Sequence, residues 1–571
     1  MVRDDVRLFN MDTQQVNKET ILFVMAVFCI GMLASEPNRW LALLLTAILI
    51  SVALAHVLFK YVSISSRHIP LILLPLLYLV SSIVTNGVTF FSIGQTLLMC
   101  VPLIASLCVT NTRSALLIII VGVSFLAITS LLGGIIPGIP NTFTPSGHFG
   151  DPRMRLQTTL LYANTGAMLF GCGIFALLGM KSHQTVHRIL KYALLFLLVV
   201  CLLLTGSRLA ITITVVLLCS YFLLLINAKK ILFAFWGIGI IVTIVAITTI
   251  PERVIGTSLA LRLIYWSDAI RAIIRYPFFG LGAEGFIFRI HELQSAIYVT
   301  RTVHNGFLQA GIDAGIPAVI TLLVLFLISL KNRWKENKGA FFSLLLLMFH
   351  SAVDFNLSFF PVLMVLGMLS LSQEEENCYP VITKQTIIHR TTTVFLAFII
   401  STSSVYLSVG ERFHSVGERA ARFGEFGRAE EAYRIGLSMM PQDFRITFRL
   451  AWVYIQTGRP ENAIILLKDS DPLRFNRAVR SQLLVMAYRD LAKLEEWDNE
   501  TLSQIKYAPF RQEAYLDRDW FLLIAYLSSF ITEFELEYEQ ALLRIMMAEA
   551  NESLHWLSGF RVERDMLLRL D

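Results

Sequence analysis

The segment Arg301–Leu308, RTVHNGFL in one-letter code, is polar and titratable and runs directly into an apolar stretch of membrane-helix length. At its centre is His304, and histidine is the residue type that most readily takes up and releases a proton near neutral pH. A base at the point where a membrane segment meets water is well placed to act on a lipid-linked substrate. The alternative is an interfacial histidine satisfied by helix-end carbonyls, and the surrounding residues decide between the two.

Two further polar motifs join apolar stretches. Thr205–Arg208 (TGSR) places an arginine close to lipid, where a charge costs up to about 2.5–3.5 kcal/mol, so a negatively charged partner is expected to offset it. In the second motif, HSAVDFNL, His350 and Asp354 are four residues apart and would share a face of a continuing helix. They could close a helix end by a local hydrogen bond or, with His304, form a metal site.

Composition identifies the class of protein that must position these groups. Of 571 residues, 55% are hydrophobic and 16% charged, and the mean hydropathy is +0.64. Soluble proteins are closer to a quarter charged, so most of this chain must face lipid. We predict an all-α polytopic membrane protein with about 12–13 transmembrane helices, because the chain has about thirteen apolar runs that reach or approach the bilayer thickness. They lie near 20–35, 40–58, 69–86, 89–109, 114–134, 158–180, 189–205, 209–226, 230–250, 308–330, 339–354, 357–373 and 392–409.

The seven cysteines all precede residue 379, and no CxxC-type pair suggests zinc or redox chemistry. We therefore expect no metal, no cofactor and no nucleic-acid partner. Residues 1–19 carry Arg3 and Arg7 without a small-residue cleavage site, so we expect the first membrane span to be retained.

The distribution of positive charge predicts the membrane topology. If residues 1–19 are cytoplasmic, every lysine before residue 410 falls in a cytoplasmic loop, which is the positive-inside pattern. The outer loops carry only arginine, whose planar fork of donors suits phosphate. Some of these arginines could instead reach lipid headgroups or pair with nearby carboxylates. The outer arginines are Arg39, Arg153, Arg155, Arg208, Arg253, Arg262, Arg271, Arg275, Arg289 and Arg301.

Two extracytoplasmic regions are expected. Residues 251–307 form a large loop inside the transmembrane domain of residues 20–409, and its amphipathic part is expected to lie on the membrane as a lid or re-entrant helix. Residues 410–571 are charged and amphipathic, with positions that recur at an offset of 34 (458 − 424 for glycine, 463 − 429 for alanine). This offset is typical of tetratricopeptide (TPR) helix pairs, so we predict a C-terminal α-solenoid of TPR-like repeats, with residues 472–571 assigned only as helical.

Together these motifs resemble the O-antigen ligase and polymerase superfamily of bacterial polytopic membrane proteins. The resemblance covers about residues 20–375, and it depends on the order of the motifs and on the long loop before the histidine. The matching pieces are Arg155-Leu156 with Tyr162-Ala163-Asn164, Thr205-Gly206-Ser207-Arg208, Arg262 with Gly280-Leu281-Gly282, His304-Asn305-Gly306-Phe307-Leu308, and His350 to Leu357.

The resemblance implies transfer or polymerisation of an undecaprenyl-pyrophosphate-linked glycan onto a hydroxyl at the outer face of the bacterial cytoplasmic (inner) membrane. It implies that His304 is the general base and that Arg208 and Arg262 hold the pyrophosphate, with Arg271 and Arg275 as alternatives to Arg262. Other residues expected at the substrate are Arg153, Arg155, Asn164, Ser207, Asn305, His350, Asp354 and Asn356. The expected partners are this donor, a glycan, lipid or protein acceptor, membrane lipid, and a chain-length regulator or another protein on the repeats.

The chemistry supports this interpretation independently. A glycosyl pyrophosphate carries its own leaving group, so the reaction needs only charge stabilisation of the departing diphosphate and a base for the hydroxyl. Two other classes of function remain open. A transporter would have broken spans in both halves and ionisable groups near the bilayer midplane, and a membrane-tethered TPR scaffold would leave the outer arginines unexplained.

Overall fold

The computed structural model describes residues 18–35, 39–60, 68–85, 89–109, 111–133, 142–145, 154–181, 184–228, 257–283, 302–370, 384–441 and 443–468, with a few single positions between them. The expected substrate residue Arg153 and the expected helices beyond residue 468 lie outside this part of the chain.

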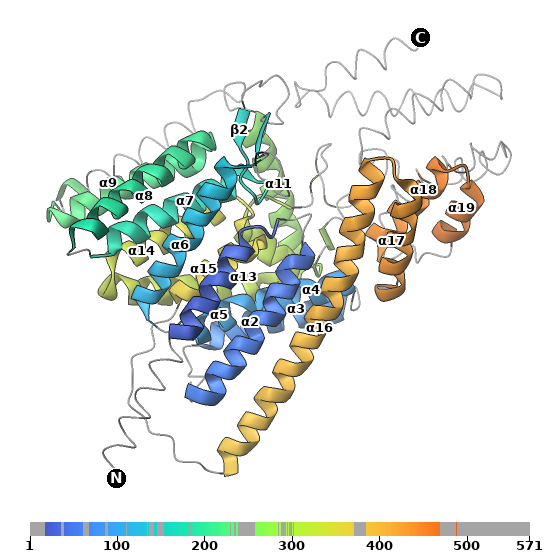
Figure 1. Ribbon diagram of the computed structural model, residues 1–571, viewed down its shortest axis with the longest axis horizontal. Helices are drawn as coiled ribbons and strands as arrows, with labels where there is room; N and C mark the ends of the chain where they lie inside the picture. Colours follow the sequence, from blue (N-terminus) through green and yellow to red (C-terminus); the bar gives the residue numbers. More distant parts are fainter. Residues whose placement is uncertain are drawn as a thin grey trace.

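The described chain is helical apart from one short two-stranded ribbon (Figure 1). This confirms the predicted all-α polytopic fold. The elements of the bundle are α2 (Arg39–Lys60), α3 (Ile69–Thr85), α4 (Phe90–Met99), α5 (Val101–Cys108), α6 (Thr112–Leu131), β1 (Phe143–Pro145), β2 (Met154–Leu156), α7 (Ala163–Gly179), α8 (Thr185–Leu204), α9 (Arg208–Leu225), α11 (Thr257–Arg275), α13 (Gly306–Glu336), α14 (Lys338–Ser351), η3 (Asn356–Ser358) and α15 (Phe360–Ser370). The long α16 (Lys384–Arg422) then leads to α17 (Phe426–Met439), α18 (Phe444–Gln456) and α19 (Pro460–Lys468).

Six helices in the described ranges are long and apolar enough to cross a membrane, and five more are apolar but shorter, with 10–17 residues. The span predicted at 230–250 lies largely outside the described residues. The run predicted at 89–109 is divided into α4 and α5 at Cys100. Pro102 follows this break, in the first turn of α5, where its missing N–H costs no helical hydrogen bond.

Helix α7 lies at the centre of one half of the bundle and packs against α6, α8, α9 and α14. Its small residues allow this close packing. A Cβ atom added at Gly171 would lie 2.5 Å from Leu346 of α14 and 2.7 Å from the Thr214 hydroxyl of α9. By contrast, α8 and α16 expose large apolar side chains such as Phe196 and Phe398. These two helices have the outward apolar surface of lipid-facing spans.

Four connecting segments meet at one end of the bundle, which we call the site end. They are the β1–β2 ribbon, the Thr205–Ser207 turn before α9, the Val303–Asn305 segment before α13 and the Ala352–Phe355 link after α14. Asn305 caps α13, because its side-chain oxygen accepts hydrogen bonds from the backbone N–H groups of Phe307 and Leu308, both at 3.0 Å. The cap fixes the point where α13 begins, one residue after His304.

Helix α13 contains a kink at Ala314 and Gly315, where Gly315 has a φ of 79°. The backbone groups released by the kink are satisfied by the turn that follows α11. The Ile316 N–H donates to the Pro277 carbonyl at 2.7 Å, and the Ile312 carbonyl accepts from Leu281 N–H at 2.6 Å. Irregular backbone inside a membrane helix is stable only with such partners, so the kink couples α13 to α11.

We expect Gly315→Ala to destabilise the fold by about 1–3 kcal/mol, because φ at this position is left-handed and an added Cβ would lie 2.4 Å from the Phe278 carbonyl oxygen. The melting temperature of the purified protein in detergent measures the effect. Gly427→Ala is the matched control, since a Cβ at Gly427 in α17 meets nothing within 4 Å. Equal melting temperatures for Gly315→Ala and wild type would contradict the expected strain.

The helices after residue 384 are attached to the bundle through a buried charge cluster. Helix α16 packs along α2, and Glu411 of α16 forms ion pairs with Arg445 of α18 at 2.8 Å and with Arg39 of α2 at 3.8 Å. Within α17–α19 the glycines that define the 34-residue offset, Gly424 and Gly458, both have positive φ, 75° and 68°. The TPR-like character of residues 410–571 stays a prediction.

Candidate functional site

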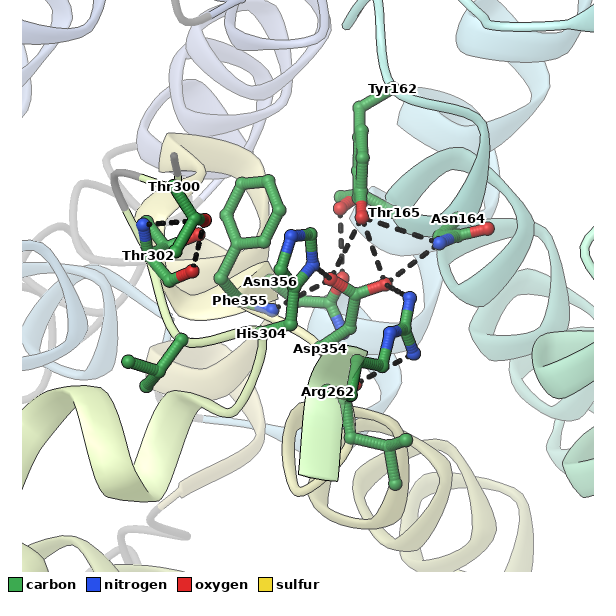
Figure 2. A network of polar contacts seen from close by, with 12 residues as sticks. Tyr162, Asn164, Thr165, Arg262, Thr300, Thr302, His304, Asp354, Phe355 and Asn356 are labelled. Carbon is green, nitrogen blue, oxygen red and sulfur yellow. Dashed lines mark hydrogen bonds and ion pairs between the residues drawn. The ribbon is translucent and has the colours of Figure 1, made fainter. Parts of the chain in front are cut away.

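The buried carboxylate of Asp354 is the centre of a polar network at the site end (Figure 2). The Tyr162 hydroxyl lies 2.9 and 3.0 Å from its two oxygens, and the Asn164 amide donates to Oδ2 at 2.8 Å. The backbone N–H of Phe355 donates to Oδ1 at 2.9 Å. These donors come from the start of α7 and from the link after α14, so the packing of α7 against α14 assembles the network.

His304 is also held by this carboxylate. Its Nδ1 lies 3.3 Å from Asp354 Oδ1, and its side chain is 25% exposed, whereas that of Asp354 is fully buried. The ring lies between Tyr265 and Phe355, with centroid distances of 6.1 and 5.0 Å. A carboxylate can only accept, so Nδ1 must carry the proton of this hydrogen bond. In the neutral ring Nε2 is then the nitrogen with a free lone pair.

The backbone around His304 is fastened to the link that carries Asp354. His304 has a φ of 49°, a left-handed conformation that is uncommon for a residue with a side chain. The Asn305 amide donates to the Ala352 carbonyl at 2.6 Å, and the Gly306 N–H donates to the Asp354 carbonyl at 3.1 Å. The histidine and its carboxylate partner are therefore positioned by two segments bonded to each other.

Arg262 of α11 supplies positive charge to the same carboxylate. Its Nη2 lies 3.6 Å from Asp354 Oδ2, and its Nη1 donates to the Val353 carbonyl at 3.0 Å. Burial raises the pKa of Asp354, but the hydrogen bond from His304 and the charges of His350 and Arg262 outweigh burial and lower the pKa to about 2. Asp354 is consequently ionised throughout the working pH range of an enzyme.

Three arginines of α11 were candidates for binding the pyrophosphate, and of these Arg262 is the one that reaches the network. Arg271 forms an ion pair with Asp268, and Arg275 lies over the Tyr276 ring, 5.6 Å from its centroid. Residues 261–274 were predicted to be amphipathic. In the structure they belong to α11, which packs against α13.

Arg155 of β2 links the network to the Thr205–Ser207 turn. Its Nε donates to the Thr205 carbonyl at 2.8 Å, and its Nη2 lies 3.4 Å from the Asn164 side-chain oxygen. The ribbon places Arg155 by antiparallel pairing with Thr144. Thus the TGSR motif is connected to Asp354 through Arg155 and Asn164.

The start of α9 presents groups suited to an anion. Ser207 is 2% exposed, and its hydroxyl has no hydrogen-bond partner among the described residues. It occupies the N-cap position without a side-chain cap bond, which leaves the first N–H groups of α9 available. Arg208 follows with an exposed side chain that forms no hydrogen bond or ion pair with the described part of the chain. This arginine does not contact Asp354.

His350 and Asn356 form a separate buried layer behind the network. Both are fully buried, and the Asn356 amide lies 2.5 Å from His350 Nδ1, while its oxygen accepts from the Thr165 hydroxyl at 2.8 Å. The helix does not continue as far as a shared face with Asp354 would require, because α14 ends at Ser351 and Asp354 lies on the link beyond it. No group of three or more His, Cys, Asp or Glu side chains in the described ranges is arranged to hold a metal ion.

The contribution of Tyr162 was missed from the sequence. It belongs to one of the matching motifs, yet no role followed from its position two residues before Asn164. The structure brings together His304, Arg262, Asn305, Asp354, Asn164 and Arg155, and it places Ser207 and Arg208 on a neighbouring turn.

Comparison with known families agrees with this geometry. Residues 193–323 match the family model of the O-antigen ligase, which confirms the resemblance to the O-antigen ligase and Wzy-type polymerase superfamily. The matched range contains Arg208, Arg262 and His304 and ends before Asp354. The match indicates a glycan ligase-like or polymerase-like function in general terms, and the apolar helices indicate a membrane protein. None of the curated proteins matches the chain.

Proposed function

We propose that this chain transfers or polymerises an undecaprenyl-pyrophosphate-linked glycan onto an acceptor hydroxyl at the outer face of the cytoplasmic membrane. The observation that carries the proposal is the hydrogen bond between His304 Nδ1 and the buried, ionised Asp354. This bond fixes the ring and leaves Nε2 as the proton acceptor, which is the arrangement of a general base with its orienting carboxylate. The O-antigen ligase match supports the class of reaction.

In the proposed step, His304 Nε2 takes the proton of the acceptor hydroxyl while its oxygen attacks the anomeric carbon of the donor sugar. The bond from that carbon to the pyrophosphate oxygen breaks, and the pyrophosphate leaves with the electron pair. Asp354 stabilises the imidazolium that forms without taking its proton. Direct displacement inverts the configuration of the anomeric carbon. The step requires neither a metal ion nor a nucleotide.

The arginines stabilise the charge of the leaving group in this proposal. Arg262 is 15% exposed and lies beside Asp354, so it can contact the pyrophosphate nearest the reacting atoms. Arg208 is exposed at the start of α9, where the helix N-terminus and the Ser207 hydroxyl add further donors. Interactions that strengthen as charge develops lower the barrier, and a fork of N–H donors is suited to this task.

The buried residues of the network take supporting roles in the proposal. Asp354 orients His304, Tyr162 and Asn164 hold Asp354, and burial keeps His350 and Asn356 from direct contact with substrate. Arg155 and Asn305 hold the neighbouring segments together, and Arg153 is a further candidate for donor binding. Residues 410–571 are proposed to lie on the extracytoplasmic side and to bind the acceptor, a chain-length regulator or another protein.

We expect Arg208→Ala to weaken donor binding and to lower the transfer rate further, because the contact strengthens as the pyrophosphate gains charge. Because one charge-assisted contact is lost, the transfer rate should fall by about 10–100-fold. Arg208→Lys should recover little if the contact is bidentate, since an ammonium group cannot reproduce a planar fork. Arg188→Ala, at an exposed arginine on α8, is the control. Full recovery by lysine would contradict a two-pronged contact.

The proposed function is tested with purified protein and a lipid-pyrophosphate glycan, without added metal or nucleotide. The expected result is release of undecaprenyl pyrophosphate with formation of a new glycosidic bond. Strict dependence on a divalent ion or on ATP would overturn the mechanism. Glycolipids from a deletion strain then separate the two classes of acceptor. Single repeat units without polymer indicate a polymerase, and accumulated lipid-linked polymer indicates a ligase.

A further inference from the structure

A second hydrogen-bonded pair lies beneath His304, within α13. Gln309 and Asp313 are one helical turn apart, and the Gln309 amide donates to Asp313 Oδ1 at 2.9 Å. The side-chain oxygen of the same Gln309 accepts from the backbone N–H of Val303 at 3.2 Å. Val303 is fully buried and immediately precedes His304. Gln309 therefore connects a carboxylate in the helix to the peptide that leads into the histidine.

Asp313 is unusual in its location. It is 7% exposed on an apolar helix that is long enough to span a membrane, where an ionisable side chain is costly. Its backbone is held as well, because the Ser81 hydroxyl of α3 lies 2.6 Å from the Asp313 carbonyl and 2.5 Å from that of Phe279 in the turn after α11. Asp313 thus lies immediately before the α13 kink with its backbone carbonyl hydrogen-bonded to α3, and Gln309 connects its side chain to the peptide before His304.

A small, mostly apolar cavity adjoins this pair. It has a volume of about 30 Å³, and its lining includes Tyr78, Gln95, Gln309, Asp313 and Phe355. Phe355 also contacts the His304 ring, with a centroid distance of 5.0 Å. A cavity of this size has room for about one or two water molecules, next to the side chains of Gln95, Gln309 and Asp313.

We propose that Gln309 and Asp313 are positioning residues for the general base. They fix the direction of the Val303–His304 peptide, so that His304 keeps its left-handed backbone and its ring reaches Asp354. The strained φ of His304 persists only while its surroundings hold it, and the bond from Val303 N–H to Gln309 is one of the contacts that hold it. This inference rests on the proposed function, in which His304 is the general base.

The first test compares Gln309→Met and Asp313→Asn in single-turnover transfer. Methionine keeps the length of the side chain but removes both hydrogen bonds, so the transfer rate should fall by about tenfold or more while donor affinity stays near the wild-type value. Asparagine still offers an oxygen to the Gln309 amide, so Asp313→Asn should keep most of the activity, and Asp313→Ala should not. Loss of donor affinity without loss of rate in Gln309→Met would overturn the proposal.

A double-mutant cycle separates positioning from general packing. If Gln309 acts through His304, Gln309→Met should add no further loss of rate to His304→Ala. An equal loss in both backgrounds would show that Gln309 acts elsewhere. Thr321→Val is the matched control, because it removes a partly buried hydrogen bond from the same helix, the one that the Thr321 hydroxyl donates to the Pro317 carbonyl at 2.7 Å. It should leave the transfer rate unchanged.

A measurement without turnover distinguishes failure of this inference from failure of the proposed function. Diethylpyrocarbonate modifies imidazole nitrogens, and peptide mass spectrometry reports the modification rate of His304 by itself. Gln309→Met should change this rate at least about threefold, because the ring loses its fixed environment, whereas Thr321→Val should not. If no lipid-pyrophosphate donor is consumed by the wild type, the proposed function fails, yet the modification rate still decides whether the pair positions His304. An unchanged rate would refute the positioning role.

Discussion

His304→Ala is expected to lower the single-turnover rate of glycan transfer by about 10²–10⁴-fold while donor binding remains nearly intact. The loss follows from the geometry, because the ring of His304 is fixed by Asp354 and its second nitrogen is the proton acceptor in the proposed step. In the proposed mechanism Arg208 and Arg262 hold the pyrophosphate, so the substitution removes a contact made to the acceptor hydroxyl. Equilibrium binding of the donor and rapid-quench analysis of the product measure the two effects separately.

His187→Ala is the control for this experiment, since His187 is an exposed histidine on α8. It should transfer glycan at the wild-type rate. Added imidazole should restore part of the activity of His304→Ala if the missing function is that of a base. A wild-type rate in His304→Ala would remove the foundation of the mechanism.

Asp354→Asn is expected to lower the transfer rate by a comparable factor, on the order of 10²–10⁴. An amide is neutral and cannot stabilise the imidazolium. In addition, the NH₂ group of the asparagine would face Tyr162, Asn164 or Arg262, whose donors point at a carboxylate in the wild type. Donor binding should weaken less than the rate. Near-normal turnover with a correctly folded Asp354→Asn protein would assign the orientation of His304 to another residue.

The same substitution has a pH-dependent effect on stability. The pKa of Asp354 falls from 3.8 to about 2 in the folded protein, which corresponds to about 2 kcal/mol of stabilisation. Because the folded pKa is the lower one, this stabilisation is complete above about pH 4 and is lost as the pH falls toward 2. Carboxylates of ordinary pKa are ionised from about pH 5 to 8. The difference in melting temperature between wild type and Asp354→Asn should therefore be constant over this range and shrink below about pH 4.

The local signals in the sequence were sufficient for some residues of the site. The segment around His304 stands out because polar residues precede a long apolar run, and Arg262 lies on a visibly amphipathic stretch. The same hydropathy pattern predicts the helical membrane bundle, since the requirement for apolar length is local. These features need no knowledge of how the helices pack.

The contacts that make the site depend on tertiary packing and could not be predicted. Tyr162 and Asp354 are 192 residues apart, and they meet because α7 packs against α14. Whether the helix of His350 continues to Asp354 could not be decided, because the helix ends at Ser351 and sequence patterns place such a boundary only approximately. The link through Arg155 required a short strand ribbon that hydropathy does not indicate.

The charge cluster at Glu411 has a consequence for how such proteins can be recombined. Glu411 belongs to α16, a continuous helix of 39 residues. Its ion-pair partners are Arg39 at the start of α2 in the bundle and Arg445 of α18, which follows α16 in the chain. A chimera that exchanges only the part after residue 410 removes Glu411 together with Arg445 and leaves Arg39 of α2 without its carboxylate partner unless the new segment supplies one. Exchange of the appended helices therefore depends on a residue at position 39, far upstream in the chain, and a chimera should keep a carboxylate at the position of Glu411.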